Sequence, residues 1–278
     1  MKIKRLGICC ALLLLVSISS WSIAGGVKLY ALDRDSGDLA EVNPQTGVLI
    51  GSPSPLTLSG FVVSKGLGMA LDPSDFTTVY AVIEDDASNR RLVTLDLNTA
   101  VATDVGLLSD LVAAITFDDT GQLWGVTGDG ATDSETLFTI NKTTAVMTQV
   151  TALGDGTDGE TIAFNYDNDL LYTRSGNEAA FPGQALTSID PSNPIPTTIV
   201  ISSADGFGEP TGLVYDEDTG MLLEADRQER LMGINVSTGV FTEIAPAVQG
   251  GPTLRGLMFF PSKQDLIFYD GVNLNNAP

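Results

Sequence analysis

The chain has 278 residues and is strongly acidic, with 35 Asp and Glu against 14 Lys and Arg and no histidine. A surface of this charge repels nucleic acid and anionic lipid, because binding to phosphates needs clustered Lys and Arg. The missing imidazole excludes a Ser-His-Asp triad and removes the commonest transition-metal ligand. We therefore expect neither a nucleic-acid-binding protein nor a hydrolase of the triad type.

The first 24 residues have the pattern of a cleaved signal peptide. Lys2, Lys4 and Arg5 precede an apolar stretch over residues 8–18, and small residues at 22–24 then provide a cleavage site after Ala24. The apolar stretch is shorter than the roughly 20 residues that span a bilayer, which disfavours the alternative of a retained anchor. We predict export to the periplasm or secretion, with no membrane anchor after cleavage.

The only cysteines, Cys9 and Cys10, lie inside the predicted signal peptide. No cysteine follows the apolar stretch, so a lipidated N-terminus is not expected. Residues 25–278 then have no thiol or disulfide, and their 11 basic and 35 acidic residues give a net charge of −24. This acidity is either a device for solubility or a means of attracting divalent cations.

Residues 25–278 contain an internal repeat of short apolar strands. Five segments share an apolar strand that ends in an aromatic residue or Leu, and the period between equivalent positions is 44 to 51 residues. These first strands are 69–72, 115–118, 162–165, 213–216 and 257–260. Second strands are centred on 79–80, 123–124, 171–172, 222–223 and 267–268, with a further copy at 29–30. Third strands, each leading through a short turn to a fourth, are 39–43, 91–97, 137–141, 186–190 and 231–235.

Four short strands in each period of about 40–50 residues are typical of a β-propeller. We predict an all-β propeller of four-stranded blades that forms one domain over residues 25–278. If 257–260 completes the blade that begins at 29–30, the ring has five blades and is closed by strands from both termini. The predicted strand at 267–268 then belongs to no blade. Separate terminal blades would give six. We prefer five blades. The alternative fold, a two-sheet sandwich, would not explain the period of 44 to 51 residues.

The turns within this repeat carry a family resemblance. Residues 216–220 read Asp-Glu-Asp-Thr-Gly and residues 118–121 read Asp-Asp-Thr-Gly. Over residues 27–270 the chain resembles secreted bacterial propellers of the broad YVTN and quinoprotein-like group, in which such turns recur between strands. The resemblance implies a fold and a compartment, and it implies no activity.

A candidate ligand site follows from equivalent positions just before the first strands. Lys65, Glu160, Glu209 and Arg255 are expected to converge at the mouth of the central channel, on the face that carries the loops between blades. The set would suit a cation or a polar ligand, and the alternative is a solvated rim with incidental ion pairs. Propellers of the lactonase type use an acidic residue at a similar place to bind a metal, and Glu209 resembles it.

A second candidate is the acidic loop after the strand at 29–30. Asp33, Asp35 and Asp38 place oxygen donors close together, and Ca²⁺ prefers six to eight such hard ligands. An EF-hand is excluded, because the position that needs Glu holds Pro44. Calcium is the only cofactor we predict, and a plain β-turn is the alternative.

We therefore predict an exported, non-enzymatic propeller that binds a ligand, or an envelope or extracellular protein, through its loop face. The competing prediction is a metal-assisted hydrolase or lactonase-like enzyme that uses Glu160 and Glu209. A third prediction is that the protein is a purely structural component of the envelope. Trp124, on a second strand, is expected to be buried.

Overall fold

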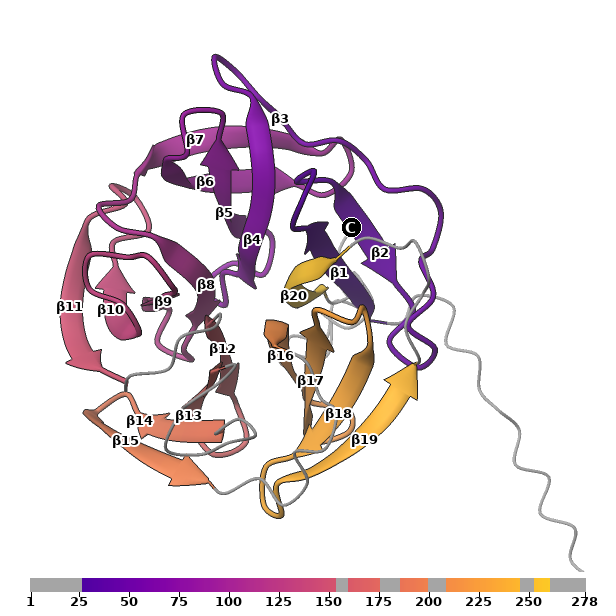
Figure 1. The fold of residues 1–278 in the computed structure, drawn as a ribbon, viewed down its shortest axis with the longest axis vertical. Helices are drawn as coiled ribbons and strands as arrows, with labels where there is room; N and C mark the ends of the chain where they lie inside the picture. Colours follow the sequence, from indigo (N-terminus) through magenta and orange to yellow (C-terminus); the bar gives the residue numbers. More distant parts are fainter. Residues whose placement is uncertain (1–26, 154–159, 176–185, 200–208, 246–252, 261–278) are drawn as a thin grey trace, which may run out of the picture.

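The computed structural model describes residues 27–153, 160–175, 186–199, 209–245 and 253–260. All regular elements in these ranges are β-strands, and they form five sheets around a central axis (Figure 1). The predicted signal peptide and the extra strand at 267–268 lie outside the described residues. Within the described ranges, no helix is long and apolar enough to cross a membrane.

Four blades consist of strands that follow one another in the chain from the central axis outward. Each is an antiparallel sheet whose innermost strand is the first strand of the repeat. Blade 2 contains β4 (Val63–Leu71), β5 (Val79–Asp85), β6 (Arg90–Asp96) and β7 (Val101–Leu107). Blade 3 contains β8 (Val112–Phe117), β9 (Leu123–Thr127), β10 (Thr136–Ile140) and β11 (Met147–Ala152). Blade 4 contains β12 (Glu160–Asn165), β13 (Leu170–Ser175), β14 (Leu186–Asp190) and β15 (Asn193–Ile199). Blade 5 contains β16 (Pro210–Asp216), β17 (Met221–Asp226), β18 (Leu231–Asn235) and β19 (Val240–Ala245).

Blade 1 closes the ring with strands from both ends of the described chain. Its inner strand is β20 (Leu254–Phe260), followed outward by β1 (Lys28–Asp33) and β2 (Leu39–Val42). Residues 48–54 take the outer position through isolated bridges to β2. The predicted fold, with five blades closed by strands from both termini, is confirmed.

One strand was not predicted from the sequence. β3 (Thr57–Leu58) pairs in parallel with β7 and adds a fifth strand to the outer edge of blade 2. Two residues are too few to show strand periodicity. The pairing is stabilised by Leu56 and Leu58, which are buried in the apolar cluster between blades 1 and 2.

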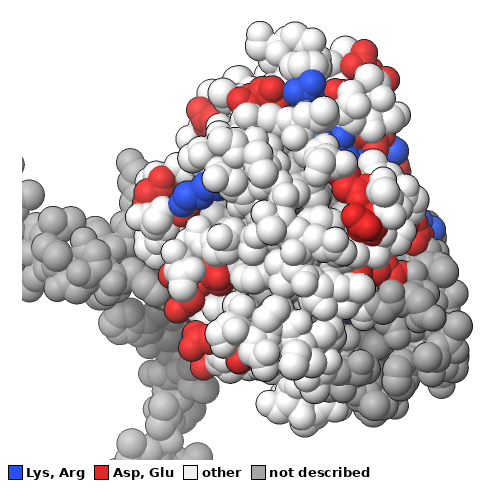
Figure 2. Space-filling view, turned by 90° about the vertical axis from the view of Figure 1, so that its left-hand side faces the viewer, with Lys and Arg blue, Asp and Glu red and all other residues white. Residues whose placement is uncertain are grey.

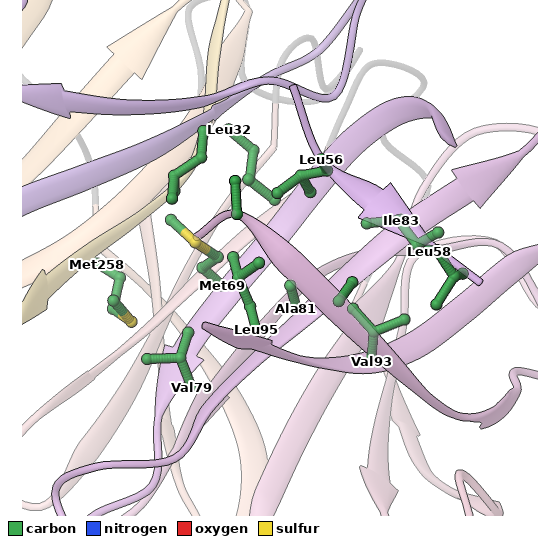
Figure 3. Packing of buried hydrophobic residues seen from close by; sticks show 13 residues of the cluster. Leu32, Leu56, Leu58, Met69, Val79, Ala81, Ile83, Val93, Leu95 and Met258 are labelled. Atoms are coloured by element: carbon green, nitrogen blue, oxygen red, sulfur yellow. The ribbon is translucent and has the colours of Figure 1, made fainter. Parts of the chain in front are cut away.

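The hydrophobic core is divided into five clusters, one between each pair of neighbouring blades. The strand β5 shows how one blade contributes to two clusters. Its residues Val79, Ala81 and Ile83 contact blade 1, whereas Tyr80 and Val82 on the other face contact blade 3. A strand buried on both faces has no polar alternation, which is why these segments are continuous apolar runs. In Figure 3, Leu32 and Met258 of blade 1 lie beside Met69, Val79 and Leu95 of blade 2.

The Asp-Asp-Thr-Gly turn at residues 118–121 has a structural role. The buried Asp118 carboxylate accepts hydrogen bonds from the backbone N–H groups of Thr120 and Gln122 and from the Trp124 indole, the last at 2.8 Å. Gly121 has a φ of +79°, which a residue with a side chain rarely adopts. The turn therefore closes the hairpin and also anchors a core tryptophan.

Four of the five inner strands, β4, β8, β16 and β20, approach one another closely at one level of the channel. A Cβ on Gly68 would lie 2.8 Å from the Ile115 backbone nitrogen, and one on Gly256 would lie 2.7 Å from the Met69 backbone nitrogen. Gly212 similarly faces Leu257 at 3.0 Å. We call this the glycine level. Glycine at these three positions lets the backbones of neighbouring inner strands approach closely, and we use the level only to divide each inner strand into a loop-face part and a part toward the other end of the channel.

Candidate functional site: a basic cluster at the channel mouth

The four predicted ligand residues all lie on the loop-face side of the glycine level. Lys65 is within β4, Glu209 directly precedes β16, and Arg255 is the second residue of β20. Glu160 is the first residue of β12, and its side chain lies outside what the structure describes. Their role as ligand-binding residues stays a prediction.

Arg255 is surrounded by other cations. The register pairs it with Leu32 of β1, and the Arg34 backbone N–H donates to the Thr253 carbonyl at 2.9 Å. Burial is the main reason why the pKa of Arg255 falls to about 10. Repulsion from Arg34, Arg90 and Arg227 lowers this pKa further, whereas the Glu209 carboxylate opposes the shift.

Two carboxylates form ion pairs with Lys65, Arg90 and Arg227. Glu84 at the end of β5 accepts from the Lys65 ammonium at 2.7 Å and from Arg90 Nη2 at 3.0 Å. Glu209 accepts from Arg227 Nε at 2.6 Å. Burial, partly offset by Glu84, lowers the pKa of Arg90. Glu84 and Glu209 are therefore involved in ion pairs that fix the orientation of the basic side chains.

We define the basic cluster as Arg34, Lys65, Arg90, Arg227 and Arg255. It holds five of the 11 basic residues in positions 25–278, although that part of the chain has a net charge of −24. Among the described residues, Nε and Nη1 of Arg90 and Nε of Arg255 are buried and have no hydrogen-bond partner. Guanidinium groups in this state match carboxylate and phosphate, which accept two parallel hydrogen bonds.

Arg255 and Lys65 were predicted from the sequence, whereas Arg34, Arg90 and Arg227 were not. These follow a second strand or open a third strand, and both positions lie at the loop face. The equivalent positions of these arginines in the repeat, at the loop-face ends of second and third strands, were the signal by which the sequence could have identified them. The predicted set came only from residues just before the first strands and contained two carboxylates and two cations, whereas the structure adds three guanidinium groups from other positions of the repeat.

The predicted calcium loop forms a tight turn. The Asp33 carboxylate accepts the backbone N–H of Asp35 at 2.9 Å, and the Asp38 backbone N–H lies 3.3 Å from the Ser36 hydroxyl. No group of three or more acidic side chains placed to hold a metal ion occurs in the part of the chain that the structure describes. Calcium binding by Asp33, Asp35 and Asp38 stays a prediction from the sequence.

Thermal unfolding tests that prediction. A site that binds Ca²⁺ only in the folded state adds about 2.7 kcal/mol at a hundredfold excess over Kd. Millimolar CaCl₂ should then raise Tm above the value in NaCl of equal ionic strength, and Asp33→Asn with Asp35→Asn should remove the difference. Equal Tm values in the two salts would contradict a calcium site.

Acidic residues outnumber basic ones on one side of the ring. Figure 2 shows Asp and Glu side chains in separate groups over one side, with fewer Lys and Arg among them. Asp96 and Asp190 accept backbone hydrogen bonds in turns, and these hydrogen bonds lower the pKa of both carboxyl groups. The concentration of five cations in the basic cluster therefore contrasts with the side of the ring in Figure 2.

Comparison with known proteins supports the fold alone. No protein-family model and no curated protein sequence matches the chain. Among solved structures, TolB from Acinetobacter baumannii is similar with a TM-score of 0.55 and 11% identity, over 86% of this chain and 67% of that one. A protein of unknown function from Bacteroides caccae has a TM-score of 0.53 and 10% identity, over 84% of this chain and 99% of that one. At these identities, the chain shares the propeller fold with them, as the sequence resemblance implied.

Proposed function

We propose that the protein is an exported, non-enzymatic propeller that binds an anionic group of a ligand or partner at the basic cluster. The observation that carries the proposal is the concentration of five cations at the channel mouth of a chain whose net charge is −24. Solubility alone would not require basic side chains to be concentrated at the channel mouth. Export is proposed from the signal-peptide pattern of the first 24 residues.

The preferred ligand groups are carboxylate and phosphate. Arg90 and Arg255 each keep a buried N–H without a partner among the described residues, and an oxyanion would supply the missing acceptor. The two carboxylates of the site cannot do so alone, since Glu84 and Glu209 already form ion pairs. Binding of an anion would also relieve the repulsion that lowers the pKa of Arg255.

Calorimetric titration with inorganic phosphate and with succinate, at constant ionic strength, tests the proposal. Wild type is expected to give saturable binding of at least one anion. Arg255→Gln should weaken it about tenfold or more, because a hydrogen bond to a charged group is worth about 1.5–3 kcal/mol.

Lys28→Gln is the matched control. It removes one positive charge from the opposite end of β1, where Lys28 pairs with Glu41 at 2.9 Å. The control is expected to bind the anion as wild type does. Equal losses in both variants would mean that only the net charge matters, and the site assignment would be wrong.

The metal-assisted hydrolase or lactonase-like alternative has no observation in its favour. Glu209, one of its two expected metal ligands, forms an ion pair with Arg227. The side chain of the other, Glu160, lies outside the described residues. Activity on lactones that is lost with chelator would support this alternative against the proposal.

A further inference from the structure

The end of the channel opposite the basic cluster contains an apolar cavity of about 650 Å³. Its walls are the segments of all five inner strands that follow the glycine level, beginning with Met69, Ile115, Ile162, Leu213 and Leu257. A volume of this size is typical of pockets for small organic ligands. The mouth opens at the hairpin turns between first and second strands.

The cavity begins directly after the glycine level. Gly68, Gly212 and Gly256 immediately precede the wall residues and bring the inner strands into backbone contact. No residue of the basic cluster lines the cavity in the described part of the chain, so the two sites use different residues.

The rim of the cavity is acidic. It is formed by Asp119, Asp167, Asp216, Glu217 and Asp218 from the hairpin turns, and no Lys or Arg lines the cavity among the described residues. Asp119 and Asp218 are exposed, and their carboxylates form no hydrogen bond or ion pair with the described part of the chain. The nearby Lys142 is already paired with Asp72 at 2.5 Å.

Aromatic rings stand between the apolar walls and this rim. Tyr166 lies edge-on to Phe164 with ring centroids 4.9 Å apart, and the residue is 39% exposed. The Tyr215 hydroxyl donates to the Asp167 carboxylate. Aromatic faces and unpaired carboxylates both attract organic cations.

We propose that this cavity binds an apolar organic cation, with the hydrocarbon body against the inner strands and the ammonium group between Asp119 and Asp218. Charge complementarity selects this occupant. A second copy docked rim to rim would place like charges together, and the segment 261–278 carries more acidic than basic residues. The site is distinct from the anion site of the proposed function.

Three probes of one shape test the charge preference by calorimetry on the full chain. They are 4-phenylbutylammonium, neutral 4-phenylbutanol and anionic 4-phenylbutyrate. The cation is expected to bind about tenfold more tightly than the alcohol, since exposed charge pairs and cation–π contacts each add about 0.5–1 kcal/mol. The anion should bind most weakly.

Two variants locate the binding. Asp119→Asn with Asp218→Asn should weaken binding of the cation about fivefold and leave the alcohol unchanged. The matched control is Asp86→Asn with Glu243→Gln, which removes two exposed carboxylates outside the cavity and should change neither. Thr116→Phe, at a half-buried wall position, should block all three probes by filling the cavity.

Equal affinity for the three probes, or an unchanged affinity in the rim variant, would overturn the proposal. So would the absence of binding to wild type. Phe268→Asp places a charge in the apolar part of segment 261–278 and would weaken any binding of that segment in the cavity. If the cation binds to this variant but not to wild type, the occupant of the cavity is the chain's own C-terminal segment, and the proposal of an organic cation is wrong.

Discussion

Replacing Trp124 with Ala is expected to lower the free energy of unfolding by about 3–5 kcal/mol. The side chain is 5% exposed and lies between blades 3 and 4, in the cluster that contains Ile162 and Phe164. Its removal leaves a cavity and also takes the indole donor away from the buried Asp118. Urea denaturation followed by circular dichroism measures the change.

Trp124→Phe is the control, because it keeps most of the buried ring and removes the indole N–H. Its expected cost is smaller, about 1–3 kcal/mol for the unsatisfied Asp118 oxygen. An Ala variant with an unchanged urea midpoint would show that the indole contributes nothing to the interface between the blades.

Glu224→Leu is expected to destabilise the fold by about 3–5 kcal/mol, because it leaves a buried guanidinium without its carboxylate. Arg174 of β13 and Glu224 of β17 form an ion pair between blades 4 and 5, and both side chains are 0% exposed. Burial raises the pKa of Glu224 to about 7 in spite of the attraction by Arg174. The carboxylate is thus costly to bury, and arginine cannot give up its charge to compensate for the loss of its partner.

A double-mutant cycle separates the pair from general packing. Adding Arg174→Met to Glu224→Leu should recover most of the lost stability, because two apolar side chains often replace a buried ion pair without net cost. The Arg174 guanidinium also lies 4.8 Å from the centre of the Phe241 ring, a contact that Met can partly keep. If the double variant is as unstable as the sum of the single changes, the two side chains are not coupled.

The sequence alone determined the propeller fold and favoured five blades over six, and the closed ring of five sheets in the structure decided the number. Each first and second strand is a local apolar run followed by a turn whose residues have a fixed chemistry, as in the hairpin at Asp118. These signals recur at a regular period, and the closing strand β20 was predicted because it repeats the pattern of the other inner strands. β3 was missed, since a two-residue strand is specified by its neighbours rather than by its own periodicity.

Only the tertiary structure decided which charges meet. Arg34, Arg90 and Arg255 are far apart in the chain, and no spacing rule connects residues at the ends of strands in different blades. Closure of the ring brings them to one channel mouth and buries them, which is what changes the pKa of Arg255. The apolar cavity likewise requires all five inner strands, because each contributes only a few residues to its wall. Local patterning therefore predicts the elements, whereas burial and electrostatics at the axis depend on contacts that exist only after the ring has closed.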